Sequence, residues 1–186
     1  MIYPLKLEMA FIISGLLLTL LSGIALLRPY EVQEWLRGVP RSKVLGFVFL
    51  TIAGVWSWVL ISTIDLGEFS NWRPRLMVLI PAAYLLTLKF VDEFLAARAL
   101  GMVVLLAAEP LLESAFLRPE QTRLALVALA YIGIVFAMFW IGMPYTLRDQ
   151  IGWLSKNESR WRAAAFVGLI YGVLLLILPV TLHRSA

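Results

Sequence analysis

The chain has 186 residues, of which 61% are hydrophobic and 15% are charged. Soluble globular chains carry about 45–50% apolar and about 25% charged residues, so a soluble fold of this size cannot bury so much apolar surface. The sequence has no cysteine and one histidine, His183, which excludes disulfides, thiolate metal sites, iron–sulfur clusters and any site built from two histidines. The net charge of +4 is typical of basic cytoplasmic loops, and without basic runs it does not predict nucleic-acid binding.

Four charge-free stretches predict membrane-spanning helices, because each reaches the ~20 residues that a helix needs to cross about 30 Å of hydrocarbon. The predicted spans are 8–27, 44–64, 124–143 and 163–182. The first stretch is too long for a typical signal-peptide core, and no Ala-x-Ala cleavage site follows it, so we interpret it as a retained helix.

The centre of the chain, residues 76–117, is apolar but carries internal charges. Four charged residues interrupt it: Lys89, Asp92, Glu93 and Arg98. A single helix over this segment would be about 63 Å long, twice the bilayer thickness. We therefore predict a turn at the charged cluster, with spans at 74–93 and 96–117. The favoured architecture is an all-α bundle of six transmembrane helices in one domain, 1–186, and the alternative has five helices with a bent central segment.

Two similar segments follow the first and fifth spans. Each begins with a Pro-Tyr pair, at Pro29 and Pro144, and continues with a short amphipathic sequence containing Trp-Leu. This pattern predicts two interfacial helices, 30–37 and 145–154, lying flat on the membrane. Six crossings place both helices on the same face, whereas five place them on opposite faces. Alternatively, Pro-Tyr and Trp simply recur at membrane interfaces.

The distribution of basic residues predicts an orientation. With six crossings, the loops on the face of the two short helices carry ten basic residues, against six on the other face. Because cytoplasmic loops accumulate Lys and Arg, we predict that the first face is cytoplasmic. Both termini then lie on the non-cytoplasmic side of a bacterial-type inner membrane.

Three charged residues form a polar stripe on the predicted span 96–117. Arg98, Glu109 and Glu113 lie near one face of that helix, although a charge within a span costs about 2.5–3.5 kcal/mol on insertion scales. A functional interpretation is a proton or cation pathway. A structural interpretation is that Glu109 bonds to a neighbouring helix, while Glu113 and Arg98 reach the two headgroup layers.

A second charged group lies at the turn before this span. The spacing of Lys89, Asp92 and Glu93 places them on one helical face, where they predict a self-paired interfacial cluster. The alternative is a gate in which Arg98 pairs with Glu93 across the turn.

Small residues in the first and last spans predict close helix packing. Gly168 and Gly172 form a GxxxG motif, and Gly15, Thr19 and Gly23 have the same four-residue spacing. The packing could lie within the bundle or between subunits.

Several common arrangements of catalytic residues are absent from the sequence. It has no Gly-x-Ser-x-Gly elbow, no phosphate-cradling glycine loop and no metal-ligand cluster, which favours a protein that is not an enzyme and has no cofactor. The leading hypothesis is a non-catalytic structural or assembly component, with membrane lipids and a second copy or another membrane protein as partners. The alternative is a small proton- or cation-coupled carrier or channel that uses the polar stripe. A third hypothesis is a lipid-headgroup enzyme that uses carboxylates.

Overall fold

The structure is a computed structural model that describes residues 5–90 and 94–182, with side chains up to residue 179. Helices account for most of these residues, and the described ranges contain no strand. The helices are α1 (Leu7–Leu27), α2 (Pro29–Gly38), α3 (Lys43–Thr63), α4 (Arg73–Phe90), α5 (Leu95–Ala115), α6 (Arg123–Gly142), α7 (Tyr145–Ser155) and α8 (Glu158–Leu182). Two short 3-10 segments, η1 (Val39–Arg41) and η2 (Gly67–Trp72), connect α2 to α3 and α3 to α4.

Five helices in the described residues are long and apolar enough to cross a membrane: α1, α3, α5, α6 and α8. The chain is therefore an all-α membrane protein with several spans. The helix α4 differs from these five, because it has 18 residues and contains Arg73, Arg75 and Lys89. It covers most of the predicted span 74–93, but Asp92 and Glu93 lie outside the described residues.

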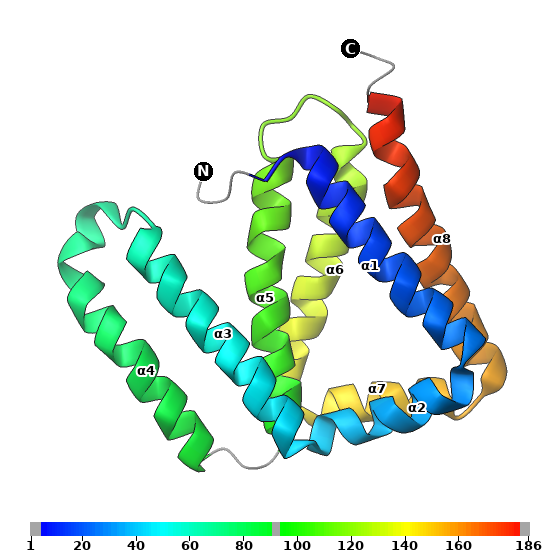
Figure 1. The fold of residues 1–186 in the computed structure, drawn as a ribbon, viewed down its shortest axis with the longest axis horizontal. Coiled ribbons are helices and arrows are strands. Elements are labelled where there is room, and N and C mark those ends of the chain that lie inside the picture. Colours follow the sequence, from blue (N-terminus) through cyan, green and yellow to red (C-terminus); the bar gives the residue numbers. More distant parts are fainter. Residues whose placement is uncertain (1–4, 91–93, 183–186) are drawn as a thin grey trace.

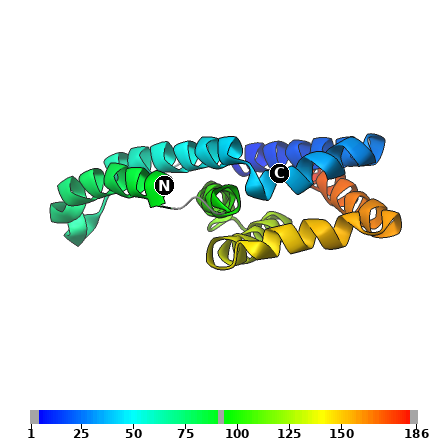
Figure 2. The ribbon, with the colours of Figure 1, turned by 90° about the horizontal axis from the view of Figure 1, so that it is seen from below.

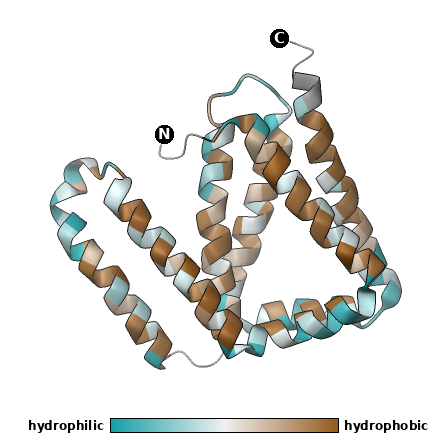
Figure 3. Ribbon diagram, viewed as in Figure 1, coloured by the Kyte–Doolittle hydropathy of each residue, from teal (hydrophilic) through white to brown (hydrophobic). Residues whose placement is uncertain are grey.

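The long helices form a flattened array, with α2 and α7 lying across one end of it (Figures 1 and 2). Hydrophobic residues line the long helices, and hydrophilic residues gather at the two ends and along α2 and α7 (Figure 3). This distribution matches a bilayer, because apolar side chains on the outside of the array then contact lipid.

The directions of the helices follow from their contacts. The starts of α3 and α5 lie together, since a Cβ atom built at Gly46 would be 3.0 Å from the Ala96 backbone nitrogen, so these two helices run in parallel. The helix α4 runs back alongside α3 (Figure 1). Tyr84 and Thr51 are joined by a 2.9 Å hydrogen bond, and Trp58, about two turns further along α3, donates to the Met77 carbonyl at 3.3 Å.

The helices α2 and α7 are entered through the same kind of bend. Arg28, which directly follows α1, has φ −129° and ψ 60°, and Met143, which directly follows α6, has φ −130° and ψ 74°. A proline follows each of these residues and stops the preceding helix, because proline lacks the backbone N–H. The two short helices lie at the same end of the array and touch each other: Arg37 donates to the Ser155 carbonyl at 3.2 Å.

The helices α1 and α8, from opposite ends of the chain, pack most closely. A Cβ atom at Gly172 would lie 2.5 Å from Thr19 Oγ1 and 2.8 Å from Thr19 N, and one at Gly15 would lie 2.9 Å from the Gly172 carbonyl oxygen. A Cβ at Gly168 would collide with the Ser22 hydroxyl. The GxxxG motif of α8 thus faces the small residues of α1 in the same chain. Gly23 lies outside this interface, because a Cβ there would meet nothing within 4 Å.

Two apolar clusters join the helices at opposite ends of the array. The first contains Leu7, Ala10, Phe11, Ala115, Leu126 and Leu175, and so links α1, α5, α6 and α8. The second contains Ala97, Leu147 and Ile151, with Leu36 and Trp140 packed against them. It attaches α2 and α7 to the start of α5, so the two short helices are held against the array by side chains.

Candidate functional site

The two carboxylates of the predicted polar stripe share one groove beside α5 and α6. Glu109 and Glu113 line an open groove of about 500 Å³, together with Leu105, Ala108, Leu112, Phe116 and Ile134. All of these residues except Phe116 and Ile134 belong to α5, and Ile134 comes from α6. Glu109 is half-buried and makes no ion pair or hydrogen bond with the described residues. The groove therefore presents a carboxylate within an apolar surface.

Arg98 lies apart from these carboxylates. It occupies the first turn of α5, and eleven residues of helix separate it from Glu109, a distance of about 16 Å along the axis. Its side chain is half-buried, and its Nε atom is buried without a hydrogen-bond partner in the described residues. Arg98 and Glu109 therefore mark two separate positions on one helix.

The predicted charge cluster before α5 is described only in part. Lys89 lies in the last turn of α4, and its ammonium group is 5.6 Å from the centroid of the Phe90 ring. Its predicted partners Asp92 and Glu93 lie outside the described residues. Phe94, which begins the next described segment, has φ 55° and ψ 28°, a left-handed conformation that is uncommon for a large side chain.

The basic residues concentrate at the end of the array that carries α2 and α7. Of fifteen described Lys and Arg residues, ten lie there: Arg28, Arg37, Arg41, Lys43, Lys89, Arg98, Arg148, Lys156, Arg160 and Arg162. Four described acidic residues share this end: Glu31, Glu34, Asp149 and Glu158. Three ion pairs form among them, Arg28–Glu31 at 3.1 Å, Arg148–Asp149 at 2.8 Å and Arg162–Glu158 at 2.6 Å. The described residues of this end therefore carry a net charge of +6.

No protein-family model, curated protein or solved structure matches this chain. The functional assignment consequently rests on the geometry of the chain itself.

At the opposite end, two arginines complete the ends of helices. Arg73 donates to the Ile64 carbonyl at 2.5 Å, after the last residue of α3, and Arg123 donates to the Ala115 carbonyl at 3.1 Å, at the end of α5. Helix C-termini leave carbonyl groups without partners and carry partial negative charge, which a guanidinium group satisfies. Arg75 stacks over the Trp72 ring at 4.9 Å. These three arginines therefore make contacts that stabilise the fold.

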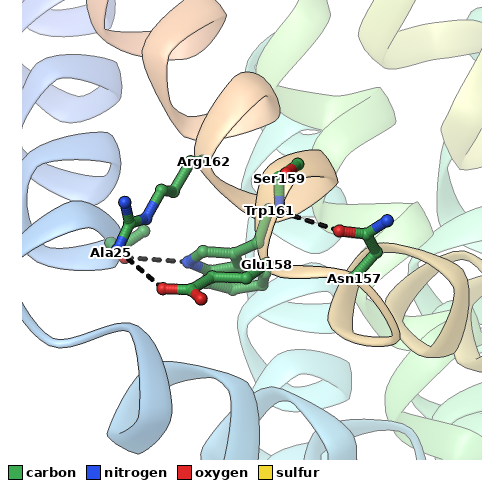
Figure 4. A network of polar contacts seen from close by, with 6 residues as sticks. All are labelled: Ala25, Asn157, Glu158, Ser159, Trp161 and Arg162. Carbon is green, nitrogen blue, oxygen red and sulfur yellow. Dashed lines mark hydrogen bonds and ion pairs between the residues drawn. The ribbon is translucent and has the colours of Figure 1, made fainter.

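A buried tryptophan joins α8 to the end of α1. The Trp161 indole is 5% exposed and donates from Nε1 to the Ala25 carbonyl at 2.9 Å (Figure 4). In a continuing helix, that carbonyl would accept from residue 29, but Pro29 has no N–H to donate. Asn157 begins α8 by accepting a 2.9 Å hydrogen bond from the Ser159 nitrogen (Figure 4). The sequence signal for this contact is Pro29, four residues after Ala25, which leaves the Ala25 carbonyl without its usual helical donor.

Proposed function

We propose that this protein is a non-catalytic assembly component of a membrane, and that the groove on α5 binds a transmembrane helix of a partner polypeptide. The position of Glu109 carries this proposal. The carboxylate lies about 9 Å before the end of a helix that is apolar enough to span the membrane, in a groove open to the side of the array.

A carboxylate in contact with lipid is energetically costly. Insertion scales assign about 2.5–3.5 kcal/mol to an acidic side chain at the centre of a span, and such residues typically face protein or water. A partner helix that brings a Lys, an Arg or a hydrogen-bond donor into the groove would offset this cost. The apolar lining of the groove, with Leu105, Leu112 and Ile134, would supply the packing surface for the same helix.

We further propose that α4 makes a sixth crossing. Parallel α3 and α5 support this topology, because the chain between two parallel spans must return through the membrane. The two short helices then share one face, and the ten described basic residues at that end, against five at the other, favour placing it in the cytoplasm, with both termini on the other side. Cysteines introduced at Gln33, Ser70 and Leu95 test this topology without background labelling, since the chain has no cysteine of its own. If the cysteines introduced at positions 33 and 95 were labelled from opposite sides of the membrane, six crossings would be contradicted.

A crosslinking experiment tests the assembly function. A cysteine at Ile134, which lies across the groove from Glu109, is coupled to a photoactivatable maleimide in native membranes. We expect an adduct of discrete mass whose yield falls at least about tenfold when Glu109→Leu removes the carboxylate, because loss of one charged contact typically costs more than 1.4 kcal/mol. The matched position is Ile132, on the same helix, 54% exposed and outside the groove.

Two controls separate the outcomes. The variant Glu68→Gln removes an exposed carboxylate in η2 and should leave the adduct unchanged. The proposal would be contradicted if cysteines at positions 132 and 134 gave equal yields of adduct. It would also be contradicted if Glu109→Leu left the yield of the adduct from position 134 unchanged. In reconstituted vesicles, proton flux that disappears in Glu109→Gln would overturn it in favour of a carrier.

A further inference from the structure

The two ends of the array differ strongly in charge. Ten basic and four acidic described residues lie at the end with α2 and α7, whereas five basic and four acidic described residues lie at the other, apart from Glu109 and Glu113 in the groove on α5. At the second end, Arg73 and Arg123 are bound to backbone carbonyls and Arg75 is stacked on Trp72. Among the described residues, the excess positive charge is therefore concentrated at the first end, where Arg37, Lys156 and Arg160 form no ion pair with a described carboxylate.

Three of these cations gather at the end of α7, and we call Arg37, Lys156 and Arg160 the basic corner. Arg37 comes from α2, and its hydrogen bond to the Ser155 carbonyl brings it beside Lys156, the next residue. Arg160 stacks over the Trp153 ring at 4.6 Å, two residues before Ser155. The three side chains are exposed, and none of them forms an ion pair with a described residue.

The two short helices beside the basic corner are suited to the headgroup layer. Both α2 and α7 lie across the ends of the long helices (Figure 1), and each exposes a tryptophan, Trp35 at 59% and Trp153 at 58%. Amphipathic helices with Trp and Lys or Arg lie in the plane of the interface, and clustered cations at this depth attract anionic lipids. Zwitterionic headgroups offer no such net charge.

We propose that the basic corner binds the phosphate group of an anionic phospholipid in the leaflet against which α2 and α7 lie. Charge complementarity favours an anionic ligand, because the three cations have no carboxylate partner within the described chain. The fold determines the position, because Arg37 of α2 comes beside Lys156, which follows α7, and Arg160, in the first turn of α8, only when the two short helices are in contact. This inference does not depend on the groove at Glu109.

The proposal is tested by lipid titration of the full chain in detergent, monitored by native mass spectrometry. The probes are phosphatidylglycerol and phosphatidylcholine of identical acyl chains. We expect phosphatidylglycerol to bind the unmodified protein more tightly, and its affinity to fall at least about tenfold in Arg37→Gln/Lys156→Gln/Arg160→Gln, since each cation near a membrane surface contributes about fivefold. Phosphatidylcholine affinity should not change.

Two variants complete the test. Lys6→Gln/Arg75→Gln/Arg118→Gln removes three exposed cations from the opposite end and should leave phosphatidylglycerol binding unchanged. Arg37→Lys/Arg160→Lys keeps the charge and should retain binding to within about threefold. An equal loss in the opposite-end variant would show a general effect of net charge and overturn the proposal. Unchanged binding in the triple glutamine variant would also overturn it.

Discussion

Two antiparallel helix pairs in this protein are held together in different ways. The pair α1–α8 joins the two ends of the chain through glycines and small polar residues, and α1 alone has six buried residues, among them Ser14, Gly15 and Ser22. The pair α3–α4 is adjacent in sequence, yet α4 has no buried residue. Proximity along the chain therefore does not decide how tightly two helices pack in this fold.

The physical difference lies in how close the backbones come. Lipid tails are as apolar as leucine, so helices in a membrane gain little from hydrophobic burial and depend on close packing and hydrogen bonds. The glycines of α1 and α8 allow backbone atoms to meet directly. Between α3 and α4, side chains leave an open groove of about 250 Å³ on one side and, together with α5, another of about 360 Å³.

The largest loss of stability is expected from Gly172→Leu, which disrupts the close packing of α1 against α8. The new Cβ would lie 2.8 Å from the Thr19 backbone nitrogen, which cannot move aside as a flexible side chain could. Overpacking typically costs about 1–3 kcal/mol and occasionally more, and a backbone clash relaxes least, so we expect loss of the folded monodisperse protein on mild heating in detergent. Size-exclusion chromatography after a temperature series measures it.

Gly23→Leu is the matched control for that substitution. Gly23 lies on α1, and a Cβ there would meet nothing within 4 Å. We expect the Gly23 variant to elute as the unmodified protein does. If Gly172→Leu is tolerated as well as Gly23→Leu, close backbone packing does not stabilise the α1–α8 pair.

A smaller loss of stability is expected from Trp161→Phe, which tests how much hydrogen bonding stabilises the α1–α8 pair. The substitution keeps an aromatic ring but removes the Nε1 donor to the Ala25 carbonyl, and Pro29 cannot replace it. A buried carbonyl left without a partner costs about 1–2 kcal/mol, which should lower the midpoint of thermal unfolding. Trp153→Phe is the control, because Trp153 is 58% exposed. Equal shifts in the two variants would mean that the hydrogen bond contributes nothing.

The composition and the charge-free stretches are sufficient to predict the membrane class and the positions of the long helices. The GxxxG spacing of Gly168 and Gly172 indicates a close contact, but the spacing alone does not indicate which helix lies on the other side of that contact. The partner helix begins at Leu7, at the other end of the chain, and two segments so far apart meet only through the complete fold. The sequence therefore predicts which surfaces pack tightly more readily than what they pack against.

In the candidate site, too, the sequence identifies a residue that stands out but not the residues that come together around it. Glu109 stands out in the sequence as a charge within an apolar span, and the structure places it in the groove on α5. The basic corner was not predicted, because Arg37 and Lys156 come together only through the contact between α2 and α7. Repeated Pro-Tyr segments identified both short helices, but no pattern in either segment specified their contact.

The smallest effect is expected from Tyr84→Phe in the α3–α4 pair. The tyrosine hydroxyl and Thr51 Oγ1 are 2.9 Å apart, but Thr51 also donates to the Phe47 carbonyl at 2.8 Å and keeps that bond in the variant. Loss of an interhelical hydrogen bond in a membrane costs about 0.6 kcal/mol on average, so the unfolding midpoint should barely move. Hydrogen exchange in α4 should increase, because few other contacts hold α4 to α3. Tyr131→Phe, at a 57% exposed position on α6, is the control. A midpoint shift larger than that of Trp161→Phe would contradict the contrast, because it would make α3–α4 the more strongly bonded of the two pairs.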